Sequence, residues 1–194
     1  MILGLTGFSG AGKSTVAALL KENGFYHLDC DALVHNEVYR ASEVLAAIEE
    51  AFPGVVCEGK LDRPALRSRT MGDPAMLKKL NDTVMPHILA HIEAKLQKHS
   101  HQHIVLDAPL LFESGLDQRC DRVLSVISSR EAALKRIMER DHLTEDEAEK
   151  RLSSQHTAAF YIEKSDYIIN NDQGIRHLKQ VIPEVLKQFY DQSL

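Results

Sequence analysis

The chain has 194 residues, of which 44% are hydrophobic and 26% are charged, and its formal net charge is -5. This length suits one globular body with a buried core, and this composition excludes a disordered chain. A negative net charge disfavours a broad surface for binding nucleic acid. No stretch of the sequence approaches the roughly 18 apolar residues of a membrane-spanning helix. We therefore expect neither a nucleic-acid partner nor a membrane partner.

The cysteine pattern predicts a reducing compartment. Cys30, Cys57 and Cys120 are odd in number, widely spaced and without a CxxC pair. Such spacing is not typical of a disulfide framework or a zinc site. The apolar first ten residues carry no basic segment of the kind that opens a signal peptide, so we expect a cytoplasmic protein.

Strand and helix patterns alternate along the chain. Short apolar runs bounded by Gly, Asp or Asn predict five buried parallel strands, at residues 1–5, 25–29, 103–112, 122–127 and 166–170. Helical patterns lie between or after them, at 12–24, 130–141, 145–155 and 175–190. Residues 35–100 show helical periodicity without a convincing strand. Their main helix starts near Asp73 and is expected to kink or break near Pro86.

This order predicts an α/β fold, with a five-stranded parallel sheet flanked by helices and a helical insertion. We assign residues 1–34 and 99–194 to a nucleotide-binding core and residues 35–98 to the insertion.

The segment from Gly7 to Ser14 reads GFSGAGKS and matches G-x-x-x-x-G-K-[ST] in full. Glycines let the backbone N–H groups turn into one concavity, and the following helix adds its positive end. Lys13 supplies a charge for the β- and γ-phosphates, and the Ser14 hydroxyl is a ligand for Mg²⁺. Because the motif follows an apolar strand and precedes a helix, it predicts a nucleotide site.

A phosphate loop occurs in GTPase switches, motors and small-molecule kinases. The chain has no N-K-x-D motif for guanine and is short for a motor. A kinase needs a residue beside the acceptor hydroxyl, a cover against water and positive charge near the transferred group. A nucleotide switch without an acceptor remains the alternative from another class.

Two aspartates are candidates for the acceptor side. Asp29 and Asp31 stand two apart at the end of the second predicted strand, where alternation would place them on one face. A carboxylate there can take the proton of a substrate hydroxyl, and Asp31 is our choice for that role. Asp29 either orients the substrate or caps the next helix.

Residues 129–156 predict a helical hairpin. Arg136 and Arg140 share one face, as do Arg151 and Gln155, and Thr144 with Glu147 forms a capping box. Guanidinium groups match phosphate oxygens, so this hairpin is a candidate lid. A solvated charged hairpin is the alternative.

Two further features each leave two interpretations. Asp107 ends an apolar strand, where a carboxylate either reaches Mg²⁺ or bonds to the phosphate loop. His99, His101 and His103 alternate as in some metal sites, but a solvated loop is favoured.

Taken in order, these segments resemble the dephospho-coenzyme A kinase family over nearly the whole chain. The resemblance is carried by GLTGFSGAGKSTVA, LDCDALVH, GKLDRPALR, LNDTVMPHI, APLLFE, RIMERDHLTEDEAEKRLSSQ and SDYIINND. It implies transfer of the ATP γ-phosphoryl to the ribose 3'-hydroxyl of dephospho-coenzyme A, with Mg²⁺ and a helical lid at about residues 129–156 on a P-loop kinase-like core. It also implies that the helical insertion, residues 35–98, receives the acceptor. Another small-metabolite or nucleoside kinase is the alternative within enzymes. We expect a monomer or a weak homo-oligomer.

The motifs and the resemblance together give the candidate site residues. The catalytic set is Asp31, Lys13 and Arg140, and the metal set is Ser14 and Asp107. The nucleotide set is Gly10, Ala11, Gly12, Lys13, Ser14, Thr15, Arg136 and Asn171. Two positions depart from the family pattern: His35 replaces an expected arginine, and Met85 replaces an expected histidine.

Overall fold

A computed structural model describes residues 1–191. The chain divides into two compact units, residues 1–28 with 99–194, and residues 29–98. We call them the sheet unit and the helical unit. Residues 29–34, which the sequence analysis placed with the core, belong to the helical unit in this division.

The sheet unit is built on five strands. In the order β2-β5-β1-β6-β7 these are Tyr26–Asp29, Ile104–Asp107, Ile2–Thr6, Arg122–Ile127 and Tyr167–Asn170. The central strand β1 pairs in parallel with both β5 and β6, and the expected five-stranded parallel sheet is confirmed. Leu5 stands opposite Asp107 in this register, so the carboxyl ends of β1 and β5 lie side by side.

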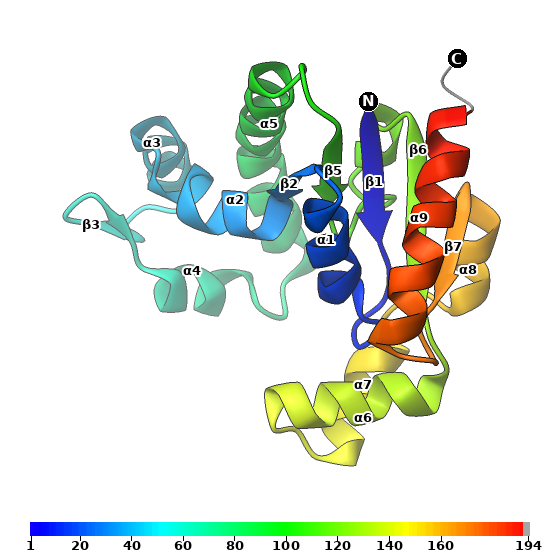
Figure 1. Ribbon diagram of the computed structural model, residues 1–194. Helices are drawn as coiled ribbons and strands as arrows, with labels where there is room; N and C mark the ends of the chain where they lie inside the picture. Colours follow the sequence, from blue (N-terminus) through cyan, green and yellow to red (C-terminus); the bar gives the residue numbers. More distant parts are fainter. Residues whose placement is uncertain (192–194) are drawn as a thin grey trace. The chain divides into compact units, whose positions relative to one another are not determined.

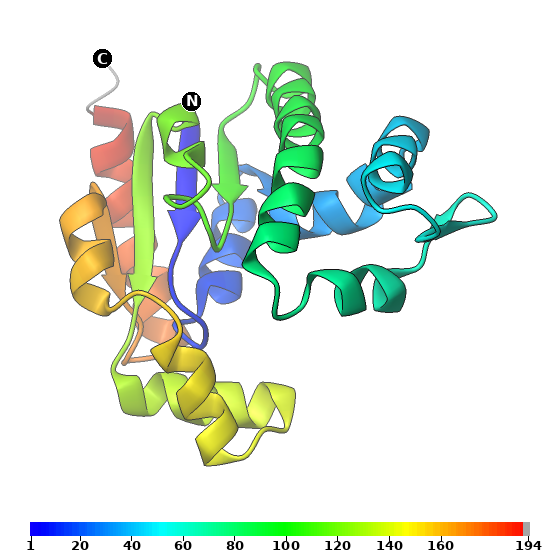
Figure 2. The same cartoon turned by 180° about the vertical axis from the view of Figure 1, so that it is seen from behind.

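Helices cover both faces of the sheet. Figures 1 and 2 show α1 (Lys13–Glu22) and α9 (Ile175–Asp191) on one face and α8 (Ala158–Lys164) on the other. The core between sheet and helices is aliphatic and aromatic, and Leu3, Leu5 and Phe189 have no exposed surface. Burial of such side chains is the main favourable term for the unit.

The remaining helices of the sheet unit follow the carboxyl ends of β5 and β6. They are η2 (Leu116–Arg119), α6 (Arg130–Asp141) and α7 (Glu145–Ser153). Strand β5 is shorter than the apolar run 103–112 predicted. The Ala108 amide still donates to the Leu5 carbonyl of β1, at 3.1 Å, but Pro109 has no N–H group to continue the ladder.

The helical unit contains four α-helices and a small hairpin. Its elements are α2 (Cys30–Asn36), η1 (Val38–Arg40), α3 (Ser42–Ala51), β3 (Val56–Cys57), β4 (Lys60–Leu61), α4 (Arg63–Thr70) and α5 (Pro74–Lys98). The antiparallel pair β3–β4 was not predicted, since two-residue strands leave no readable alternation. Helix α5 continues past Pro86 without the break that was considered, and Val84, Ile92 and Leu96 on either side are buried. In the described part of the chain, no helix has the length and apolar character needed to cross a membrane.

Candidate active site

The phosphate loop connects β1 to α1 and requires glycine at two crowded positions. Gly10 and Gly12 have φ of 80° and 100°, a region that favours glycine. A Cβ on Gly10 would collide with the backbone of Ala133, and one on Gly12 with the amide of Asn171. Gly12 is also the N-cap of α1, so the loop leads directly to the positive end of that helix.

Lys13 is held by a buried carboxylate. Its ammonium contacts Oδ1 of Asp107, whose side chain ends β5 and is 6% exposed. Nε2 of His27, on the neighbouring strand β2, lies 3.0 Å from the other oxygen, Oδ2. Burial of Asp107 weakens competition from water, so this carboxylate fixes both partners at the edge of the phosphate loop.

Arg136 and Asn171 hold the loop by its carbonyl oxygens. The Arg136 guanidinium donates to the carbonyls of Gly10, Ala11 and Asn171 at 3.1, 3.3 and 2.6 Å. Asn171 Nδ2 donates to the Ala11 carbonyl at 2.9 Å. Its Oδ1 is buried and has no hydrogen-bond partner within residues 1–191.

The hairpin of α6 and α7 contacts the loop at Ser9. Arg140 Nη2 lies 3.3 Å from Ser9 Oγ, and the Ser9 amide donates to Gln155 Oε1 at 2.7 Å. The predicted capping box at Thr144 and Glu147 is present and starts α7.

Asp141 joins the two arginines of this hairpin. Both Arg140 and Arg151 donate to it, at 2.8 and 2.6 Å. The hydrogen bond from Arg140 is the main reason that the pKa of the Asp141 carboxyl is lowered, and the same pairing raises the pKa of Arg140.

The two candidate acceptor aspartates do not share a strand face. Strand β2 ends at Asp29, whose side chain accepts from the Ala32 amide at 2.9 Å and caps α2. Asp31 is exposed in the first turn of that helix. The alternation argument was therefore wrong at Asp31, because the N-cap at Asp29 turns the chain into a helix two residues earlier.

The structure brings most of the predicted site residues, from the nucleotide, metal and catalytic sets, together at one end of the sheet unit. Contacts on or beside the loop involve Gly10, Ala11, Gly12, Lys13, Asp107, Arg136, Arg140 and Asn171. Ser14 is exposed and Thr15 half-buried in the first turn of α1. Asp31 belongs to the helical unit.

Sequence reasoning missed His27 and the roles of Asp141 and Ser9. A polar side chain in an otherwise apolar strand was the available signal for His27, but its contact depends on β2 lying beside β5. The three alternating histidines form no common cluster of metal-ligand atoms within residues 1–191. The His99 ring instead stacks on Tyr26, with 3.6 Å between ring centroids.

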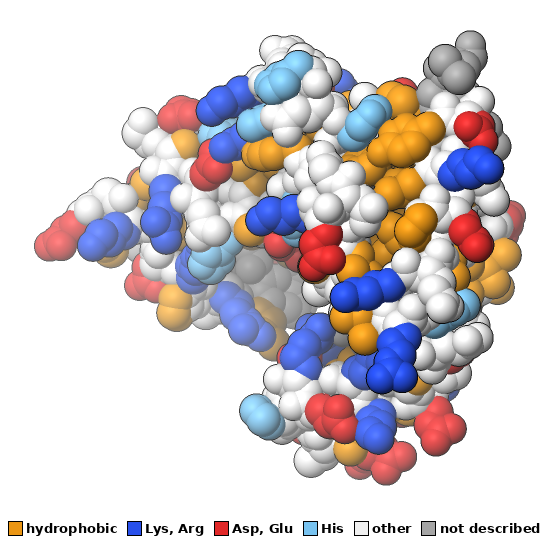
Figure 3. Space-filling view, viewed as in Figure 1, with side chains coloured by type: hydrophobic (Ala, Val, Ile, Leu, Met, Phe, Trp, Pro, Cys, Tyr) orange, Lys and Arg blue, Asp and Glu red, His pale blue; other side chains and the backbone are white. Residues whose placement is uncertain are grey.

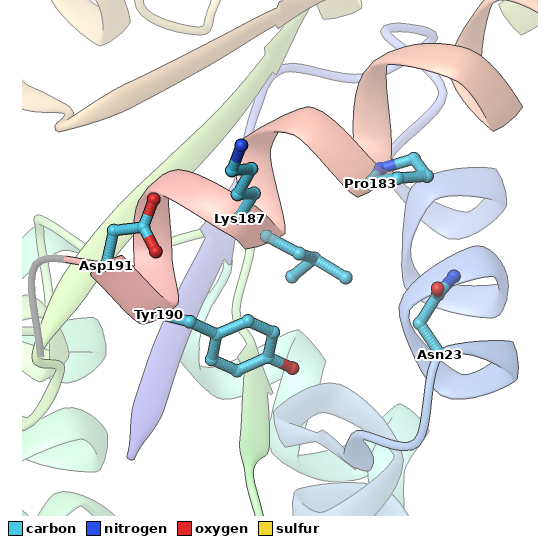
Figure 4. A pocket seen from close by; sticks show the side chains of 6 residues that line it. Asn23, Pro183, Lys187, Tyr190 and Asp191 are labelled. Atoms are coloured by element: carbon cyan, nitrogen blue, oxygen red, sulfur yellow. The ribbon is translucent and has the colours of Figure 1, made fainter.

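The sheet unit also has a hollow that lies away from the phosphate loop. Figure 4 shows Lys187, Tyr190 and Asp191 projecting from α9, with Asn23 beyond the last turn of α1. Its cavity volume is about 360 Å³. Because the phosphate loop precedes the first turn of α1, the ten-residue helix separates the two sites by about 15 Å.

The match to a family model and the similarity to curated proteins both point to the same protein family. The family model described as dephospho-CoA kinase matches residues 1–177. A dephospho-CoA kinase of Rhodopseudomonas palustris is 37% identical over 190 residues, which cover 96% of this chain and 94% of that protein.

Two solved structures extend the match to the fold. A protein from Thermus thermophilus has a TM-score of 0.82 at 31% identity, with 97% of each chain covered. A dephospho-CoA kinase from Campylobacter jejuni has a TM-score of 0.73 at 26% identity, covering 100% of this chain and 98% of its own.

Proposed function

We propose a role for each candidate residue in the ATP-dependent phosphorylation of dephospho-coenzyme A, because the chain belongs to the dephospho-CoA kinase family. That reaction is a step of coenzyme A biosynthesis. The observation that carries the proposal is the complete phosphate loop with Lys13 held on buried Asp107, within a chain that matches this family from residue 1 to residue 177.

The phosphate loop binds ATP through its amides. The carbonyls of Gly10 and Ala11 are occupied by Arg136 and Asn171, which keeps the loop in one conformation and leaves its N–H groups for phosphate oxygens. Arg136 and Asn171 thus act as positioning residues for the nucleotide. Lys13 carries the charge that stabilises the transferring phosphoryl, and the α1 N-terminus at Ser14 and Thr15 adds to it.

Ser14 and Asp107 are the residues that would hold Mg²⁺. The Ser14 hydroxyl is exposed, and each oxygen of Asp107 has one protein partner and keeps a lone pair for water or metal. This oxygen set fits a hard cation that retains several waters. When bound, the ion would neutralise charge on the β- and γ-phosphates.

Asp31 is the proposed base for the acceptor. It accepts the proton of the ribose 3'-hydroxyl while the 3'-oxygen attacks the γ-phosphorus and the bond to the β,γ-bridging oxygen breaks, which releases ADP. Arg140 already contacts Ser9 of the loop and supplies charge as negative charge spreads over the leaving and transferred oxygens. We further propose a monomer or a weak homo-oligomer, and light scattering on the purified chain over a range of concentrations distinguishes the two.

A coupled ADP-release assay with dephospho-coenzyme A tests the function, with phosphorus NMR to locate the new phosphomonoester. We expect coenzyme A as the product and no release in Lys13→Ala. ADP release with another alcohol and none with dephospho-coenzyme A would reject the acceptor. Release that does not depend on any alcohol would favour a nucleotide switch.

A further inference from the structure

His27 is a polar side chain at the edge of the sheet. It is the second residue of β2, the outer strand that lies beside β5. The Tyr26 amide before it donates to the His103 carbonyl at 2.8 Å, and the Leu28 side chain after it is 4% exposed. The backbone is therefore fixed on both sides of His27, and its side chain leaves the strand at one defined point.

The imidazole of His27 is a hydrogen-bond donor to Asp107. Its Nε2 lies 3.0 Å from Oδ2 of the carboxylate. An ionised carboxylate offers only acceptors, so Nε2 carries the hydrogen and donates it. The His27 side chain is 24% exposed, whereas that of Asp107 is 6% exposed. Water therefore reaches the carboxylate less easily than the imidazole, and it would not fully replace this donor.

The other oxygen of Asp107 holds Lys13. In the proposed reaction the Lys13 ammonium serves the β- and γ-phosphates of ATP, so it must give up at least part of its contact with this carboxylate when the nucleotide binds. The phosphates carry more negative charge than one carboxylate, which favours that exchange. Asp107 then needs a second donor if it is to keep its orientation.

Nearby cationic side chains do not supply that donor. Figure 3 shows Lys and Arg side chains over the α6–α7 hairpin and the part of the sheet unit beside it. Arg136 donates to backbone carbonyls of the loop, and Arg140 donates to Asp141. Within residues 1–191, neither of these arginines pairs with Asp107. His27 is thus the group placed to hold Asp107 once the lysine turns to the phosphates.

We propose that His27 is a positioning residue, which keeps Asp107 directed at the phosphate loop while Lys13 moves from the carboxylate to the nucleotide. This inference rests on the proposed function, in which Ser14 and Asp107 would hold Mg²⁺. His27 acts only through Asp107 and is not itself a catalytic residue. Without its N–H group the carboxylate is free to rotate, and its oxygens no longer have a fixed place for the ion or its waters.

Three substitutions of His27 that differ in their donor test the proposal. His27→Gln keeps an N–H group near the position of Nε2, His27→Asn carries the same amide on a side chain one methylene shorter, and His27→Leu has no donor. With dephospho-coenzyme A, kcat should fall at least about tenfold in the Leu and Asn variants, the loss typical of a partner that orients a metal ligand, and stay within about threefold of wild type in the Gln variant. KM for the acceptor should stay within about twofold in all three.

A second readout needs no acceptor. Titration calorimetry with Mg²⁺ present should show Kd for ATP raised about tenfold in His27→Leu and His27→Asn, because the metal depends on the oriented carboxylate. With EDTA in place of Mg²⁺, Kd should stay within about twofold of wild type, whereas a merely structural role would change Kd equally in both conditions. His101→Leu, in an exposed loop of the sheet unit, is the control and should change neither kcat nor Kd.

Three results would overturn the role of His27. These are a kcat of His27→Leu equal to that of His101→Leu, a Gln variant no more active than the Asn variant, or an equal rise in Kd for ATP with and without Mg²⁺. If the Tm of His27→Leu shows that it does not fold, the two amide variants decide by the same comparison. A wild-type enzyme that turns over dephospho-coenzyme A makes each result a failure of this inference alone. A wild-type enzyme without that activity rejects the acceptor of the proposed function, and the calorimetric comparison still decides the role of His27.

Discussion

Removal of the Arg136 side chain tests whether the phosphate loop is held by its carbonyl oxygens. The guanidinium makes one short bond to Asn171 O, at 2.6 Å, and two longer ones to Gly10 and Ala11, which we count together as one. Two charge-assisted bonds of about 1.5 kcal/mol each give about 3 kcal/mol. Because Arg136 is half-buried, water partly replaces these hydrogen bonds in the variant. We therefore expect Arg136→Ala to destabilise the ordered phosphate loop by about 2 kcal/mol.

A cost of about 2 kcal/mol corresponds to a rise of about 30-fold in the Kd for ATP if the loop must be ordered to bind it. Titration calorimetry measures this Kd, and thermal unfolding should show Tm lowered by about 4–8 °C. Arg130→Ala is the matched control, since Arg130 lies on the same helix and binds Glu149 and Ser153 instead of the loop. Equal ATP affinity in the Arg136 and Arg130 variants would show that Arg136 does not order the phosphate loop for ATP.

Three further predictions concern the α6–α7 hairpin and the thiols. Arg140→Ala should lower kcat at least about tenfold relative to exposed Arg176→Ala, and equal steady-state rates in the two variants would remove Arg140 from the mechanism. Because Arg140 lowers the pKa of Asp141, the stability that this carboxylate provides is present above its unfolded pKa and is lost as pH falls through the lower folded value. The Tm difference between wild type and Asp141→Asn should therefore shrink between pH 6 and pH 3, and a constant difference would contradict the pairing. Burial raises the pKa of the Cys120 thiol to about 12, so a thiol reagent at pH 8 should modify exposed Cys57 well before Cys120 in the folded protein, as mass spectrometry of the labelled peptides would show.

Local patterns predicted the parts of the fold that depend on neighbouring residues. The phosphate loop, the helix from Arg130 to Asp141 and the capping box at Thr144 follow from residues within a few positions of one another. Five strands were recognised because buried parallel strands are short and continuously apolar. Two local signals conflicted at the end of β2, where strand alternation and an N-cap at Asp29 predict different positions for Asp31. The N-cap prevailed, and Asp31 lies in a helix.

Contacts across long sequence separations were not predictable in detail. His27 meets Asp107 only because β2 lies beside β5, which is not its neighbour in sequence. Arg136 was expected to face the phosphates, but its donors turn to three backbone carbonyls around the loop. Helical spacing gives the face on which a side chain lies, but the partner on that face depends on how the chain folds back.

The most direct test of the account is the turnover of Asp31→Asn with ATP and dephospho-coenzyme A. The substitution keeps the size of the side chain and removes its ability to accept the hydroxyl proton. We predict a fall in kcat of at least about 100-fold, in the range of general base catalysis, with Kd for ATP within about twofold of wild type. An Asp31→Asn enzyme with unchanged kcat would contradict the assignment of Asp31 as the base.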